Sequence, residues 1–251
     1  MSRNFELLQK LGKEPEVAGR APAVAAVSAL ETRAITPPQF DLDPLQRDEL
    51  MKLVTRIFLA TGSGEVRAVT FCGLDAGGDS PWICAQAAQI LAAQVAGSVC
   101  VVDANLREPG LHEQLGIDSD QGLTDALQHP DPIREFVRPS GRPNLWFLSC
   151  GGEPWRWETL LGSDRMRARI AELRTEFDYV LIDSPVLSVS NDAASLGRAS
   201  DGVVLVLKAH SSRREVARKA VENFENERVR VLGAVLNKRT FPIPESIYNK
   251  L

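Results

Sequence analysis

The sequence has few cysteines, and none lies close enough to another to form a metal-binding or redox pair. The four cysteines, Cys72, Cys84, Cys100 and Cys150, are widely spaced, and three of them lie in apolar runs. This pattern argues against a disulfide scaffold or a CxxC zinc site. It indicates reduced thiols that pack as small hydrophobic side chains.

Long apolar runs and basic runs are also missing. No apolar run approaches 18 residues, so we expect no membrane-spanning helix. A net charge of −4 without a long basic run argues against a nucleic-acid-binding protein. The start MSRNFELLQK mixes charged and polar residues with apolar ones, so we expect no signal peptide. With 251 residues, 44% of them hydrophobic, the chain is expected to be a cytoplasmic globular protein with one large core.

One segment, Gly73–Ser80 (GLDAGGDS), has the frame of a phosphate-binding loop, G-x-x-x-x-G-K-[ST], at every position but one. Asp79 stands where the loop needs a lysine to reach the β- and γ-phosphates. Taken alone, the segment is equally well explained as a chance glycine turn. However, residues 66–72 read as a strand and residues 81–95 as a helix, which is the context that the motif requires.

The change from lysine to aspartate should weaken phosphate binding strongly. A unit charge about 4 Å from a phosphate contributes roughly 4 kcal/mol at an effective dielectric near 20, and aspartate reverses its sign. Pro81 also removes a backbone N–H from the first helical turn. Ser80 and Pro81 still predict a helix start, with Ser80 as N-cap. We expect the Asp79 carboxylate to turn toward this helix N-terminus.

The remaining pattern alternates strands and helices, which predicts an α/β fold with a doubly wound, mostly parallel sheet covered by helices on both faces. Asp183 follows four apolar residues and suits a carboxylate that holds the water shell of Mg²⁺, although such a run is weak evidence alone. The right-handed crossover rule places the loop, Asp103, Asp183 and Asn237 along one sheet edge. Further strands are expected at 98–103, 146–148, 179–183, 202–207 and 229–236, and further helices at 45–60, 157–174 and 213–224.

The chain divides by composition into four parts. The pattern of residues 1–12 predicts an amphipathic helix with Phe5, Leu8 and Leu11 on one face, which either docks a partner or membrane surface or folds back onto the domain. Residues 13–44 are predicted to be an Ala/Pro-rich linker, residues 45–240 an α/β domain that carries the phosphate-binding loop, and residues 241–251 a C-terminal tail.

The motifs of residues 45–240 occur in a specific order. They are GLDAGGDS, VVDANLREPGLH, GLTDAL, ELRTEFDYVLIDSPV, NDAASLGRASDGVVLVLK and LGAVLNK. This ordered set resembles the bacterial tyrosine kinases of capsule and exopolysaccharide systems, a branch of the MinD/ParA-like P-loop proteins. The resemblance implies a nucleotide site of Gly73, Gly78, Asp79, Ser80 and Asn237, a magnesium site of Ser80, Asp103 and Asp183, and a catalytic role for Asp103.

The departures from the kinase pattern affect the site that would bind ATP and also the tyrosines that would accept the phosphate. Asp79 replaces the loop lysine, Pro81 a small hydroxyl residue, and Asn105 the second acidic residue of a DxD motif. The family's oligomerisation motif has one glutamate and two arginines. Glu49 and Lys52 lie at its first two positions, and Thr55 stands where the second arginine belongs, with Arg56 one step beyond. The tyrosine-rich tail is missing, because the chain has only Tyr179 and Tyr248. We expect Tyr179 to pack in the core and Tyr248 to act as a docking aromatic.

The resemblance therefore implies a pseudokinase, an interaction or regulatory partner in exopolysaccharide biosynthesis and export that uses no cofactor. The implied partner is a membrane polysaccharide co-polymerase or another export component, which would hold the chain at the inner membrane, and self-association is also open. The alternative is an active autokinase or ATPase that uses ATP and Mg²⁺, with the missing cation supplied by Lys208, Arg107 or Arg213, or by a neighbouring subunit. A MinD/ParA-type positioning ATPase fits less well, because Leu74 stands where that branch needs a further lysine.

Overall fold

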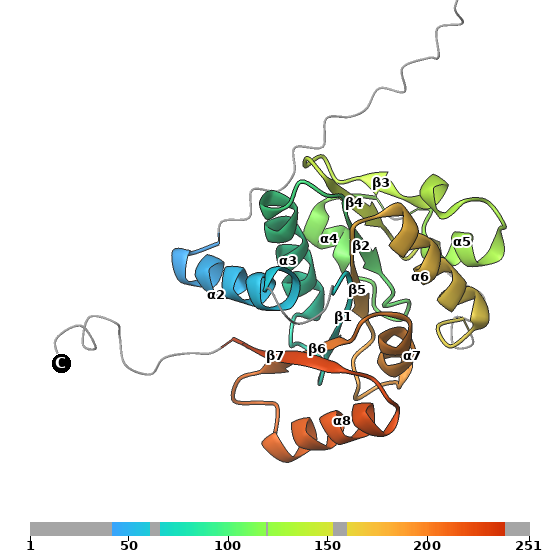
Figure 1. Cartoon of the computed structure of the whole chain (residues 1–251). Coiled ribbons are helices and arrows are strands. Elements are labelled where there is room, and N and C mark those ends of the chain that lie inside the picture. Colours follow the sequence, from blue (N-terminus) through green and yellow to red (C-terminus); the bar gives the residue numbers. More distant parts are fainter. Residues whose placement is uncertain (1–41, 61–65, 119, 153–159, 239–251) are drawn as a thin grey trace, which may run out of the picture. The chain divides into compact units, whose positions relative to one another are not determined.

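The computed structural model describes residues 42–60, 66–118, 120–152 and 160–238, all within one compact unit that spans Ile35–Leu251. The expected N-terminal helix, all but the end of the linker, and the tail lie outside the described residues. Figure 1 shows a central sheet with helices on both faces. Its seven strands lie in the order β3-β4-β2-β5-β1-β6-β7. They are β1 (Ala68–Gly73), β2 (Val99–Asp103), β3 (Arg138–Pro139), β4 (Leu145–Leu148), β5 (Tyr179–Ser184), β6 (Val203–Lys208) and β7 (Val231–Asn237).

All strand pairs are parallel except β3 with β4, so the predicted fold class is confirmed. The central strands β1 and β2 are buried along their whole length, as expected for a parallel sheet covered on both faces. Successive side chains alternate between two cores. Val69 and Phe71 contribute to one core with α3 residues, whereas Ala68 and Cys72 belong to clusters on the other face.

The helices separate by face. The first face carries α2 (Pro44–Val54), the π-helical turn η1 (Thr55–Leu59), α3 (Ser80–Gln94) and α4 (Leu111–Leu115). The other face carries α5 (Leu123–Gln128), the 3₁₀ turn η2 (Ile133–Phe136), α6 (Asp164–Glu176), α7 (Asp192–Ala199) and α8 (Arg214–Asn226). Four short elements, β3, α4, α5 and η2, and the eight-residue α7 were not expected from the sequence.

Two predicted helices have different bounds in the structure. The helix expected over residues 157–174 begins at Asp164, because the Ser163 hydroxyl accepts a hydrogen bond from the Met166 backbone N–H and caps it there. The helix expected over residues 45–60 is regular only to Val54 and then widens into η1. Asp43 and Gln46 form a capping box at its start.

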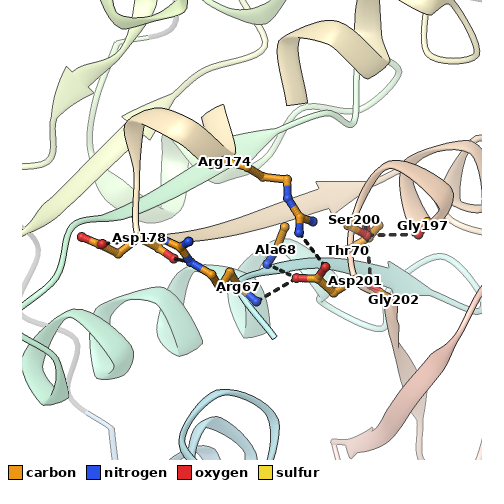
Figure 2. Close-up of polar contacts among 9 residues, drawn as sticks. All are labelled: Arg67, Ala68, Thr70, Arg174, Asp178, Gly197, Ser200, Asp201 and Gly202. Carbon is orange, nitrogen blue, oxygen red and sulfur yellow. Dashed lines mark hydrogen bonds and ion pairs between the residues drawn. The ribbon is translucent and has the colours of Figure 1, made fainter. Parts of the chain in front are cut away.

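A polar cluster anchors the amino-terminal end of β1, at the sheet edge away from the phosphate-binding loop (Figure 2). The Asp201 carboxylate accepts hydrogen bonds from the backbone N–H groups of Arg67 and Ala68, both at 2.8 Å, and pairs with Arg174 at 2.7 Å. Burial acts to raise the pKa of Asp201, but these donors outweigh it and lower the pKa below its usual value. Asp201 therefore fixes the α7–β6 connection to the start of β1.

Candidate functional site

The carboxyl ends of the parallel strands bring the residues singled out in the sequence to one edge. Gly73 ends β1, Asp103 ends β2, and Asp183 lies beside Asp103 in the register of β2 and β5. Asn237 ends β7, and its amide nitrogen donates to the Gly78 carbonyl oxygen at 3.1 Å. The predicted gathering of these residues at one edge is confirmed.

The loop backbone follows strand, turn and helix as its motif requires. The Leu74 N–H donates to the Val206 carbonyl at 3.0 Å, so the loop leaves the sheet beside β6. Gly77 has a φ of +76°, which glycine adopts without strain. Asp79 has a φ of +59°, a left-handed conformation that aspartate tolerates better than most residues, and α3 begins directly after it.

The Asp79 side chain pairs with a lysine and not with the helix. Its Oδ2 lies 2.6 Å from Nζ of Lys238, and it makes no capping hydrogen bond to α3. The expectation that this carboxylate turns toward the helix N-terminus is therefore wrong, because a full positive charge is within reach. Where a phosphate-binding loop carries a free cation, this chain carries a neutralised pair.

Ser80 contacts the sheet and does not cap the helix. Its hydroxyl donates to Asp183 Oδ1 at 2.7 Å, and the N-cap position belongs to Asp79, so the prediction of Ser80 as N-cap is wrong. Asp183 is fully buried, and its second oxygen, Oδ2, has no hydrogen-bond partner. Burial, and then the neighbouring Asp103 carboxylate, raise the pKa of Asp183 well above its usual range.

Asp103 is engaged by the loop that follows it. One oxygen accepts from the Asn105 N–H at 3.2 Å, and the other accepts from the Gly110 and Leu111 N–H groups at 3.1 and 3.0 Å. Burial raises the pKa of Asp103 to about 7, although these three donors act in the opposite direction. The carboxylate thus shapes the β2–α4 loop.

Part of the implied magnesium site fits the residues present. Asp183 Oδ2 and the Ser80 hydroxyl are hard oxygen donors that suit Mg²⁺ and its water shell, and the unpaired Asp183 oxygen would gain a partner. Asp103 fits less well, because both of its oxygens are bonded to backbone. The described residues contain no group of three His, Cys, Asp or Glu side chains arranged to hold a metal.

Three other basic side chains, which the sequence offered as replacements for the missing lysine, differ in what they contact. Lys208 Nζ is 3.4 Å from the position that a Cβ would take at Gly77, so it reaches the loop. Arg107 lies 4.0 Å from Asp192. Arg213 occupies the N-cap position of α8, with no side-chain cap bond.

Sequence reasoning missed two contacts of the loop. Besides the Lys238 pair, Asp75 Oδ2 accepts from the Ser212 hydroxyl at 3.1 Å, which ties the β6–α8 connection to the loop. Lys238 directly follows Asn237, so its place next to the edge could have been inferred. The direction in which the Lys238 side chain points could not have been inferred, because it depends on the left-handed backbone conformation of this residue, with a φ of +56°.

The residues outside the edge lie largely as expected. Tyr179 is half-buried and meets Phe58 edge-on at 5.9 Å, which confirms a packing role. The four cysteines are free and buried, and burial raises the pKa of Cys72 to about 12. Glu49 and Lys52 pair at 2.7 Å on the exposed side of α2. Tyr248 lies outside the described residues.

Comparison with known proteins gives homologues with one activity in common. The tyrosine-protein kinase YwqD of Bacillus subtilis is 31% identical over 148 residues, which cover 59% of this chain and 62% of YwqD. The tyrosine-protein kinase ptk of Acinetobacter johnsonii is 25% identical over 78% of this chain and 26% of its own length. The chain thus spans less than two thirds of either relative. No protein-family model matches the chain.

Solved structures agree with the sequence relatives. The chimerical protein CapA2B2 has a TM-score of 0.73 at 21% identity, over 81% of this chain and 88% of that chain. The kinase domain of the Escherichia coli tyrosine kinase ETK has a TM-score of 0.71 at 21% identity, over 79% of both chains. The cell division ATPase MinD of Pyrococcus furiosus has a TM-score of 0.59 at 23% identity, over 73% and 78%.

Within the described residues, no helix is long and apolar enough to cross a membrane. The sheet order, the loop between β1 and α3, and the sequence relatives all lead to the same group of proteins. The chain is a homologue of the bacterial tyrosine kinases, built on the P-loop fold that they share with the MinD and ParA ATPases.

Proposed function

We propose that this chain is a pseudokinase, a tyrosine-kinase-like protein that does not transfer phosphate and acts as an interaction or regulatory partner in bacterial exopolysaccharide biosynthesis and export. A membrane polysaccharide co-polymerase, or another export component, holds it at the inner membrane. The polysaccharide context rests on the resemblance of the ordered sequence motifs to the kinases of those systems.

The observation that carries the proposal is the pair of Asp79 and Lys238. A kinase needs an uncompensated cation at this point of the loop to hold the β- and γ-phosphates. Here the aspartate repels phosphate, and Lys238 beside it is already paired with it at 2.6 Å. Nucleotide phosphates entering the loop would have to break that pair and face the released carboxylate.

The acceptor side supports the same proposal. A carboxylate that activates a tyrosine hydroxyl must accept its proton. Both oxygens of Asp103 accept backbone hydrogen bonds, and the residue is buried, so its carboxylate is not presented to an incoming hydroxyl group. The nucleotide-site residues depart from the kinase pattern, whereas the sheet that carries them is regular. This contrast favours a function in which the surface of the domain binds a partner.

One observation favours the alternative of an active autokinase or ATPase. Lys208 Nζ lies beside Gly77, from where an ammonium group could approach bound phosphates. In that alternative Lys208 supplies the cation, and ATP with Mg²⁺ at Ser80 and Asp183 is the cofactor. Two assays separate the alternatives.

In the first assay the purified protein is incubated with Mg-ATP and probed for phosphotyrosine and released phosphate. The proposal predicts neither product, and a signal that disappears in Lys208→Ala would establish the alternative.

The second assay measures polysaccharide output in a host whose own copy is deleted. A double variant, Asp103→Asn with Asp183→Asn, keeps the shapes of both side chains and removes their charges. The proposal predicts output within about twofold of wild type, provided that the variant accumulates normally. Output as low as in the deletion strain, at normal protein level, would mean that the site performs chemistry.

A further inference from the structure

A small pocket lies between α8 and the start of the phosphate-binding loop, on the face where α8 packs beside α7 (Figure 1). Its volume is about 160 Å³. Three parts of the chain line it, namely Leu74 and Asp75 of the loop, residues 187, 188 and 191 of the β5–α7 connection, and residues of α8. None of them belongs to the predicted nucleotide or magnesium positions, so the pocket is a separate feature.

Hydrogen bonds hold the walls of this pocket in place. Two backbone hydrogen bonds of 2.9 and 3.2 Å join the β5–α7 connection to the start of the loop. At the start of α8, the Ser212 hydroxyl donates to Asp75 Oδ2 at 3.1 Å. At the end of α8, Glu227 accepts from the side-chain amide of Asn191. The pocket is therefore preformed, and a ligand does not have to order it on binding.

The interior of the pocket is apolar. Val216, Ala220 and Phe224 follow one another at helical spacing on α8, and Leu74 and Leu187 contribute from the two loops. A cavity of about 150 Å³ holds a benzene ring. The pocket is thus large enough for one phenyl group.

Exposed apolar side chains lie beside the same pocket. In the described part of the chain, four large apolar side chains are exposed, and two of them are Val189 at 56% and Val216 at 45%. Val216 lines the pocket, and Val189 directly follows the lining residue Ser188. Apolar surface next to a pocket is typical of a site that binds another protein.

The rim of the pocket carries an excess of positive charge. Residues 213–219, RREVARK, contain four basic side chains and one acidic side chain. Arg213, Arg214 and Lys219 are exposed and have no ion pair among the described residues, and Lys219 lines the pocket. The acid in the pocket wall, Asp75, already accepts a hydrogen bond from Ser212. These charges complement an acidic partner.

We propose that this pocket docks an acidic segment of a partner protein, with one phenylalanine side chain in the pocket and a neighbouring carboxylate paired with Lys219. The proposal rests on the interaction role proposed above and names the surface that performs it. A ring that enters first leaves the peptide backbone at the rim, where adjacent carboxylates reach the ammonium group. An anionic membrane would also attract the basic side chains, but a flat surface leaves the pocket unfilled, which favours a polypeptide.

Nuclear magnetic resonance titration of the isotope-labelled full-length protein with three short synthetic peptides tests the proposal. The first peptide carries one phenylalanine among aspartates and glutamates. The second has alanine in place of the phenylalanine, and the third has lysine in place of every acidic residue. The first should shift the amide signals of Leu74, Ser188 and Val216, and should bind at least about tenfold more tightly than either of the others.

Four variants at exposed positions give a matched comparison. Lys219→Glu reverses the charge at the rim and Val216→Asp places a charge at the entrance, so each should weaken binding of the first peptide at least about tenfold. Arg230→Glu and Leu45→Asp make equivalent changes outside the pocket. They should change the affinity less than about twofold. Thermal unfolding of all four variants controls for the fold.

Three results would overturn the proposal. The first is that no peptide shifts the pocket signals, and the second is that the phenylalanine and alanine peptides bind equally. The third is that vesicles of phosphatidylcholine and phosphatidylglycerol bind the protein through Lys219 while the peptides do not, which would assign the surface to a membrane. None of these results would give the chain kinase activity, so a failure here is distinct from a failure of the proposed function, which phosphotyrosine formation would reveal.

Discussion

Asp79 and Lys238, 159 residues apart in the sequence, join the start of α3 to the end of β7 through a 2.6 Å ion pair. Asp79 occupies the position at which a phosphate-binding loop carries its lysine, and Lys238 follows the strand end that contacts Gly78. The loop position therefore carries a negative charge, and the positive charge is supplied from the end of β7. The loop keeps the strand–turn–helix path of a phosphate-binding loop. Because Asp79 and Lys238 neutralise each other, the pair offers no net positive charge to a bound anion.

This ion pair should contribute little to stability. Its two side chains are 46% and 38% exposed, and pairs of this kind typically contribute about 0–1 kcal/mol. We expect Lys238→Ala to lower the free energy of unfolding by less than about 1 kcal/mol in urea titrations at low salt. Lys219→Ala on exposed α8 is the control. A loss above 2 kcal/mol would mean that the pair holds the fold together.

Asp201 should contribute far more. Asp201→Ala leaves the backbone N–H groups of Arg67 and Ala68 without their acceptor and releases Arg174, so we expect a loss of about 2–4 kcal/mol. Arg174→Ala removes only the ion pair and should cost about 1 kcal/mol. Urea unfolding of both variants measures the difference, and equal losses would contradict the role given to the backbone bonds.

The buried Asp103 predicts a pH effect. Its pKa is raised to about 7, so the folded protein holds a proton that the unfolded chain releases near pH 4. Stability from this group is present below pH 4 and is lost as the pH rises toward 7. We expect the stability of Asp103→Asn to fall less than that of wild type between pH 4.5 and 8, by about 3 kcal/mol. Parallel curves from urea titrations would exclude this linkage.

Gly197 should not tolerate a side chain. A Cβ there would lie 2.6 Å from methyl groups of Val203 and Val229, so Gly197→Ala should cost about 1–3 kcal/mol despite the helix preference of alanine. Gly162→Ala, whose nearest neighbour would be 3.9 Å away, should change stability by less than about 0.5 kcal/mol. Thermal unfolding compares them, and similar Tm values would refute the contact.

The sequence was sufficient to predict the elements that have strong local patterns. The apolar runs that become β1, β2, β5 and β6 have no competing interpretation, because buried parallel strands read as continuous hydrophobic segments. β3 escaped prediction because its two residues carry no periodicity. The start of α6 was placed too early, since apolar and aromatic residues before Ser163 suggested helix while the cap itself was overlooked.

The location of the candidate site residues at one sheet edge was predictable, but their hydrogen bonds and ion pairs were not. Asp103, Asp183 and Asn237 lie at the carboxyl ends of parallel strands, so their backbone positions share one sheet edge independently of their side-chain contacts. Whether Ser80 caps a helix or bonds a carboxylate depends on the distance between α3 and β5, which tertiary packing sets. Lys238 was missed for the same reason, because its position depends on one left-handed residue at a strand end.

The most direct test of the central claim is calorimetric titration of the full-length protein with Mg-ATP, beside the variant Asp79→Lys. The variant restores the lysine of the loop and breaks the pair with Lys238 in one step. We predict no binding to wild type at sub-millimolar ATP. Because several kcal/mol of repulsion are removed, and each 1.4 kcal/mol corresponds to a factor of ten, the variant should bind at least about 100-fold more tightly. A micromolar Kd for the wild-type protein would contradict the account.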